Sequence, residues 1–83
     1  GVRQNYQIAK QLYKKACDKN YVQACYNLGV LYHNGRGVKQ NFQIASQLYK
    51  KACDGGNMNA CNNLGFLYEY GNGVMLDYQK AEK

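Results

Sequence analysis

The chain has 83 residues, of which 46% are hydrophobic and 19% charged, and it contains neither proline nor tryptophan. This length allows one small domain. Such a domain buries little surface and often needs a disulfide or a bound metal ion to be stable. Lys and Arg outnumber Asp and Glu by 11 to 5, so the net charge of +6 favours acidic partners without identifying one. No apolar run approaches the roughly 20 residues of a membrane-spanning helix, so we expect no membrane span.

The sequence repeats itself with a period of 36 residues. Residues 1–36 align without gaps on residues 37–72 with 23 identities. Such a period is typical of helix-turn-helix units, each of which leaves an apolar face for the next unit to cover. We expect a single repeat domain over 1–83, with residues 73–83 as the truncated start of a third unit. Because the chain begins with Gly1 rather than Met, we expect a mature protein or a fragment whose partners include adjacent repeats of a longer parent chain.

The first helix of each unit, helix A, is expected over residues 6–17 and 42–53. Its apolar residues recur three and four positions apart, as one buried helix face requires. In the first unit they are Ile8, Ala9, Leu12, Tyr13, Ala16 and Cys17. Asn5 and Asn41 stand where an N-cap is expected, as does Asp77 in the third unit.

The second helix of each unit, helix B, is expected over residues 22–33 and 58–70. Its apolar face in the first unit comprises Ala24, Cys25, Leu28, Leu31 and Tyr32. Gly29 and Gly65 stand in mid-helix, where glycine costs about 1 kcal/mol relative to alanine. We therefore expect another helix to approach closely at both glycines. His33, near the end of helix B, is interpreted as a surface residue.

The repeated positions carry a family resemblance. They are Ala24, Leu28, Gly29, Leu31, Tyr32, Gly35, Gly37, Val38, Ala45, Tyr49, Lys51 and Ala52, then Ala60, Leu64, Gly65, Leu67, Tyr68, Gly71, Gly73, Val74, Asp77, Tyr78, Lys80 and Ala81. This pattern resembles the Sel-like repeat family, relatives of tetratricopeptide repeats. Cysteines eight residues apart in each unit narrow the resemblance to the Helicobacter cysteine-rich protein family. The resemblance implies an all-α solenoid of αα-hairpins in a right-handed superhelix, one disulfide per hairpin, and a secreted or periplasmic location.

The four cysteines allow three disulfide pairings. Their repeated spacing in antiparallel hairpins favours Cys17 with Cys25 and Cys53 with Cys61, which the resemblance also implies. A zinc site of four cysteines usually needs pairs two to four residues apart, and free buried thiols are the other alternative. Disulfides would indicate an oxidising compartment.

The residues themselves predict no catalytic group, metal site or cofactor. Ser46 is followed by Gln-Leu-Tyr, so it lacks the lysine that serine β-lactamases carry three positions on. His33 is the only histidine, and the five carboxylates fall mostly at turns and caps. Some members of the resembled family carry a penicillin-binding or β-lactamase label. The resemblance therefore keeps binding of β-lactams or cell-wall precursors, or weak β-lactamase activity, as the alternative function.

The candidate binding surface is the polar face of helix A, which the resemblance places on the concave side. Glutamine side chains can bind peptide backbone, and lysines can bind carboxylates, although every solenoid also has a solvated face of this composition. The candidates are Gln7, Lys10, Gln11, Lys14, Gln43, Ser46, Gln47 and Lys50, with Asn27 and Asn63 of helix B for backbone clamping or inter-repeat bonding. Tyrosines recur at apolar positions, which favours packing over base stacking, so nucleic acid is an unlikely partner on sequence grounds. We predict an exported, non-catalytic scaffold that binds a protein or peptide ligand.

Overall fold

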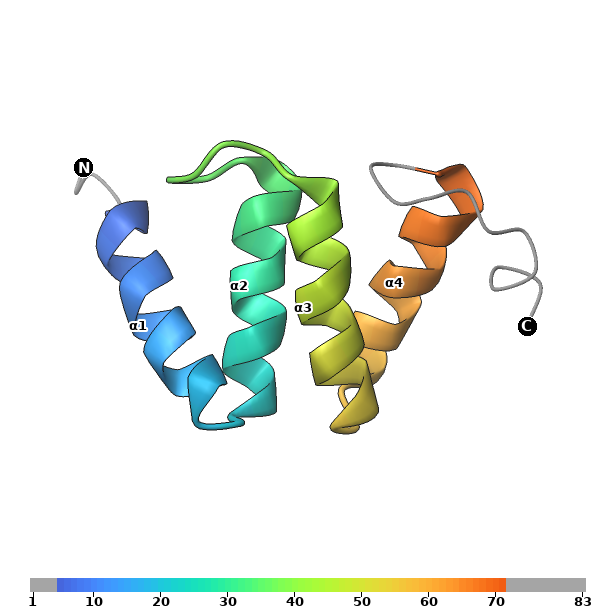
Figure 1. Ribbon diagram of the computed structural model, residues 1–83, viewed down its shortest axis with the longest axis horizontal. Helices are drawn as coiled ribbons and strands as arrows, with labels where there is room; N and C mark the ends of the chain where they lie inside the picture. Colours follow the sequence, from blue (N-terminus) through green and yellow to red (C-terminus); the bar gives the residue numbers. More distant parts are fainter. Residues whose placement is uncertain (1–4, 72–83) are drawn as a thin grey trace.

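The computed structural model describes residues 5–71 as four helices in a row (Figure 1). They are α1 (Tyr6–Asp18), α2 (Val22–Asn34), α3 (Phe42–Asp54) and α4 (Met58–Tyr70), each 13 residues long. Consecutive helices run antiparallel, and this part of the chain contains no strand. The predicted all-α fold of αα-hairpins is confirmed. The expected third unit and its Asp77 cap lie outside the described residues.

The helices begin and end where the sequence signals stand. The side chains of Asn5 and Asn41 each accept a hydrogen bond from the amide three residues later, at 3.1 and 2.9 Å. Such caps satisfy an amide that the first helical turn leaves unpaired. Gly35 and Gly71 end α2 and α4 in the left-handed conformation, with φ of 68° and 64°, which glycine adopts without steric cost. None of the four helices is long and apolar enough to cross a membrane.

A disulfide bond ties each hairpin close to its turn. Cys17 is bonded to Cys25 and Cys53 to Cys61, with a Cα–Cα distance of 4.6 Å in both pairs. The predicted pairing is confirmed, and no cysteine is free. In the chain-entropy account, closing a loop this short stabilises a fold by roughly 2–3 kcal/mol. That is a large part of the stability available to a domain of this size.

The two hairpins meet at the junction between α2 and α3, where Tyr49 is fully buried. A Cβ atom built on Gly29 would lie 2.8 Å from the Tyr49 ring, so the expected close approach at this glycine is confirmed. The Tyr49 hydroxyl is hydrogen-bonded to Nδ1 of His33 at 3.0 Å, and its ring lies 5.8 Å from that of Tyr26. His33 therefore belongs to the junction and is half-buried, where we had expected a surface residue.

The two copies of helix A differ in burial although their sequences nearly match. Ile44 and Leu48 of α3 are half-buried because the first hairpin packs against that helix. Their counterparts Ile8 and Leu12, placed in the predicted apolar stripe of α1, are 52% and 61% exposed. At the other end, a Cβ on Gly65 would meet nothing within 4 Å. The close approach expected at Gly65 is therefore absent from the described part of the chain.

The two mid-helix glycines offer a matched test of this packing. Gly29→Ala should destabilise the protein by about 1–2 kcal/mol, because overpacking against a fixed ring outweighs the gain in helix propensity. Gly65→Ala should instead stabilise it by up to about 1 kcal/mol, since the same propensity gain meets no obstacle. Urea unfolding of dilute protein measures both. Equal effects of the two substitutions would contradict the packing described for Tyr49.

The buried hydroxyl of Tyr49 should lose its proton at a higher pH than an ordinary tyrosine does. Burial raises the pKa of Tyr49 from the ordinary 10.0 to about 12, and outweighs the hydrogen bond from Asn63 that lowers it. Between these values the unfolded chain binds fewer protons than the folded one, so the free energy of unfolding should fall as pH rises from 10 towards 12. Tyrosinate absorbance at increasing pH should show one delayed step. Tyr49→Phe should remove that step, and its persistence would assign it to another tyrosine.

Candidate functional site

A groove of about 180 Å³ lies between α1 and α3, over the side of α2. One of its walls is charged and belongs to α1, whereas α2 and α3 contribute the apolar remainder. The lining residues are Lys10, Lys14, Cys17 and Asp18 of α1, Leu28 and Tyr32 of α2, and Ile44 and Leu48 of α3. The groove thus exists only because two hairpins are stacked.

The candidates on α1 lie along the charged wall and beside it. Lys10 is half-buried and lines the groove. Lys14 also lines it, and its ammonium group lies 3.1 Å from the carboxylate of Asp18, in an exposed pair one turn apart. Exposed pairs of this kind contribute little to stability. Lys14 can therefore leave Asp18 and bind another carboxylate at a small cost in free energy. Gln11 is exposed on the same helix.

The candidates on α3 fall into two groups. Gln43, Gln47 and Lys50 are exposed, and Lys50 is paired with Asp54 at 3.0 Å in the same way as its counterpart in α1. Ser46, in contrast, is only 7% exposed, and its hydroxyl donates a hydrogen bond to the backbone carbonyl of Gln43 at 2.8 Å. The Ser46 hydroxyl is thus satisfied within its own helix.

The remaining candidates make structural contacts. The Gln7 amide donates to the carbonyl of Gly37 at 2.6 Å and so ties α1 to the loop between the hairpins. The Asn63 amide donates to the Tyr26 hydroxyl at 3.5 Å, a bond between units. Asn27 accepts a hydrogen bond from a glutamine one turn earlier at 3.0 Å. The structure does not bring either asparagine into the groove.

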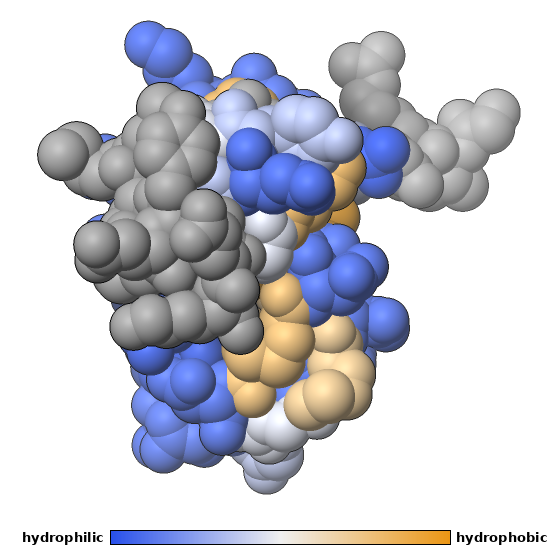
Figure 2. Space-filling model, turned by 90° about the vertical axis from the view of Figure 1, so that its right-hand side faces the viewer, coloured by the Kyte–Doolittle hydropathy of each residue, from blue (hydrophilic) through white to orange (hydrophobic). Residues whose placement is uncertain are grey.

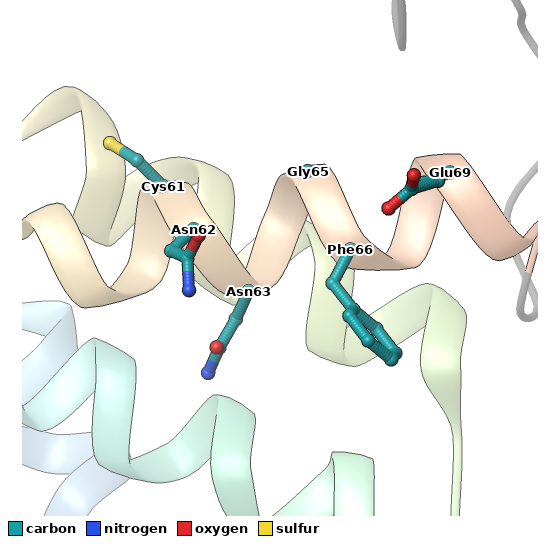
Figure 3. Close-up of a pocket in the computed structure, with 6 residues that line it drawn as sticks. All are labelled: Cys61, Asn62, Asn63, Gly65, Phe66 and Glu69. Atoms are coloured by element: carbon teal, nitrogen blue, oxygen red, sulfur yellow. The ribbon is translucent and has the colours of Figure 1, made fainter.

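Two of the other hollows in the described part of the chain are larger than the groove, and neither was predicted from the sequence. One, of about 340 Å³, lies on the other side of α1 and α2 and is lined by Tyr6, Ala9, Tyr13, Tyr26, Asn27, Val30, Leu31 and Arg36. The other, of about 400 Å³, lies on α4 and is lined by Cys61, Asn62, Asn63, Gly65, Phe66 and Glu69 (Figure 3). The sequence signal for the hollow on α4 was Gly65. This glycine stands at the repeat position of Gly29, against which the ring of Tyr49 packs. Within the described residues, no group of three His, Cys, Asp or Glu side chains could hold a metal ion.

The stacked, disulfide-tied hairpins define the protein class as an αα-hairpin repeat solenoid. The chain belongs to the Sel1 repeat family, whose repeat pattern matches residues 1–21, 22–57 and 59–83. Both the predicted family and its cysteine-rich branch are supported by solved structures. A comparison with curated protein sequences gives no match.

Three solved structures are similar to this chain. A Sel1 repeat protein from Oxalobacter formigenes has a TM-score of 0.89 and 34% identity over 98% of this chain. Cysteine-rich protein B from Helicobacter pylori has a TM-score of 0.85 and 36% identity over 94%. The protective antigen c5321 from uropathogenic Escherichia coli has a TM-score of 0.75 and 43% identity over 78%. This chain spans 33%, 59% and 14% of their respective lengths.

The two disulfides should differ in their rates of reduction. Cys17 and Cys25 are 2% and 1% exposed, whereas Cys53 and Cys61 are half-buried. Because thiol–disulfide exchange needs access to a sulfur, the Cys53–Cys61 bond should be reduced at least several-fold faster. Timed alkylation followed by mass spectrometry of peptides measures the two rates. In denaturant the rates should converge, because both bonds close loops of the same length. Faster reduction of the Cys17–Cys25 bond in the folded protein would contradict the burial pattern.

Proposed function

We propose that this chain is an exported scaffold, secreted or periplasmic, that binds an extended protein or peptide segment on its concave face. The observation that carries the proposal is the groove between α1 and α3, with a charged wall that includes Lys10 and Lys14 on one side and apolar residues on the other. The α1 and α3 helices are the two copies of helix A, which line the concave side in the interpretation drawn from the sequence. The binding segment would run across both.

The cysteine chemistry supports the proposed location. Disulfides form and persist in oxidising compartments and are rare in the cytosol. Both hairpins of this chain are closed by such a bond.

The size and chemistry of the groove favour a peptide ligand. Pockets for small molecules usually have about 300–1,000 Å³, so a groove of about 180 Å³ suits a single side chain better. Leu28, Ile44 and Leu48 offer it an apolar contact, and the ammonium groups of Lys10 and Lys14 can bind a neighbouring carboxylate. The exposed Gln11 and Gln47 side chains could bind the peptide backbone on either side. We infer a ligand with an apolar residue next to an acidic one.

The β-lactam alternative rests on the resemblance alone. A serine hydrolase needs an accessible hydroxyl with a base beside it. The Ser46 hydroxyl is nearly buried and donates its hydrogen bond to a backbone carbonyl. We therefore prefer the binding scaffold.

A displayed library of random linear peptides provides a probe for the groove. Selected peptides should contain an apolar residue adjacent to Asp or Glu. Lys10→Glu should weaken their binding about tenfold, equivalent to about 1.4 kcal/mol, because it reverses the charge on the groove wall. The Gln11→Ala/Gln47→Ala double variant should weaken it as well. Isothermal titration calorimetry with a selected synthetic peptide measures both effects.

The matched control is Lys39→Glu, which makes the same change in net charge at an exposed loop residue between the hairpins. It should leave the affinity unchanged. An equal loss in Lys39→Glu and Lys10→Glu would show non-specific charge attraction and contradict the groove. Nitrocefin hydrolysis by purified protein that is lost in Ser46→Ala would contradict the scaffold function itself.

A further inference from the structure

The two copies of helix A are almost identical in sequence, and one of their differences changes a charge. Helices α1 and α3 differ at only two of their 13 positions. Tyr6 of α1 stands at the position of Phe42, which is also aromatic, whereas Lys10 stands at the position of Ser46. Residues that recur in every unit serve the packing of the repeat. Lys10 is therefore the position at which the first unit carries a charge of its own.

Burial also distinguishes Lys10 from the other basic residues. Among the lysine and arginine residues in 5–71, Lys10 alone is half-buried, and the others are exposed. Its side chain lines the groove together with Leu28 and Tyr32 of α2. Partial burial removes part of the water that solvates an ammonium group, which costs free energy unless an anion takes the place of that water.

No anion of the described chain takes that place. Within residues 5–71 the side chain of Lys10 makes neither an ion pair nor a hydrogen bond. Lys14, the other lysine of the groove, is paired with Asp18 at 3.1 Å. Asp18 stands about 12 Å from Lys10 along the helix axis, too far to serve both lysines. The groove thus holds one paired cation and one unpaired cation.

We propose that Lys10 is the specificity-determining residue of the groove and pairs with a side-chain carboxylate of the bound segment, whereas Lys14 keeps Asp18. The inference rests on the proposed function and narrows its two lysines to one. The apolar residue next to that carboxylate enters the apolar part of the groove. A carboxylate forms a charge-assisted hydrogen bond with the ammonium group that a neutral amide of the same shape does not form. The groove therefore selects Asp or Glu over Asn or Gln.

The second unit does not offer the same group. Ser46 is 7% exposed, and its hydroxyl donates to the backbone carbonyl of Gln43 at 2.8 Å. It presents no charge to a ligand. The acidic residue is thus bound at the first unit, and this fixes where the segment lies along the helix row.

The groove differs in kind from the exposed apolar surface at the ends of the row. Figure 2 shows such surface at the α4 end, as a strip between polar side chains. The exposed Met58 and Phe66 of α4 stand at the repeat positions of Val22 and Val30, which pack against the core. The repeat pattern therefore assigns these side chains to the stacking of units. Both walls of the groove lie within residues 5–71, so no further unit is needed to form it.

A double-mutant cycle between protein and peptide tests the pairing. The probe is an amidated peptide selected from the displayed library, compared with a copy in which Asn or Gln replaces its Asp or Glu. The wild type should bind the acidic peptide at least about tenfold more tightly than the amide copy. Lys10→Met, which removes the charge and keeps a long side chain, should reduce this preference to less than about twofold. Isothermal titration calorimetry measures the four affinities.

Lys14→Met is the matched control, because it removes one charge from the same wall of the same groove. It should change the preference by no more than about threefold, as expected for an exposed ion pair. Lys10→Ser is a second test variant that gives α1 the residue of its copy α3, so the fold should accept it. It should lose the preference as Lys10→Met does. The preference is a ratio of two affinities of one folded protein, so a merely structural effect of a substitution cancels in it.

The two ways to fail are distinguishable. If the wild type selects no peptide at all, the proposed function is contradicted and this inference is overturned with it. If selected peptides bind equally well in acidic and amide form, the role of Lys10 is overturned while the binding groove stands. A preference that persists in Lys10→Met and Lys10→Ser but disappears in Lys14→Met overturns it too.

Discussion

The contact between Tyr49 and Gly29 is the constraint on which the rest of the structure depends. With no side chain on the glycine, α2 and α3 approach closely enough for the tyrosine ring to be fully buried. An aromatic ring of this kind buries 150–250 Å², a large contribution for a small domain. The same contact holds α3 beside the first hairpin, and the groove is lined by side chains of that hairpin and of α3. The groove thus depends on a contact whose two residues do not line it.

The fold divides its stabilisation between two levels. Within each hairpin a covalent bond holds the two helices together at the turn. Between hairpins only packing and a few hydrogen bonds act, among them the bonds made by His33 and Lys51. A hairpin is therefore a rigid unit with one face already matched to its neighbour. A repeat that recognises its neighbour carries the same recognition surface in every copy.

Much of the fold could be predicted from the sequence because its signals are local. The asparagine caps, the left-handed glycine Gly35 and the cysteine spacing each act within a few residues, and the helices begin where these signals predict. Burial could not be predicted in the same way. Leu12 and Leu48 have the same sequence surroundings, yet only Leu48 has a preceding hairpin to cover it. His33 was wrongly expected at the surface for the same reason. Whether a polar side chain on a helix is buried depends on the neighbouring helix, which the repeat pattern does not reveal.

The position of the disulfides has a mechanical consequence. Both lie at the turns within the hairpins, on one edge of the helix row, and the bond from Lys51 to the Cys17 carbonyl joins the hairpins at that same edge. In Figure 1, α1 and α4 lean away from the middle pair at the opposite edge. Each hairpin is thus closed covalently at the cysteine edge, whereas the two hairpins are joined covalently by the loop at the opposite edge (Figure 1). A change in the angle between the hairpins would therefore strain the hydrogen bond from Lys51 and leave both disulfides untouched.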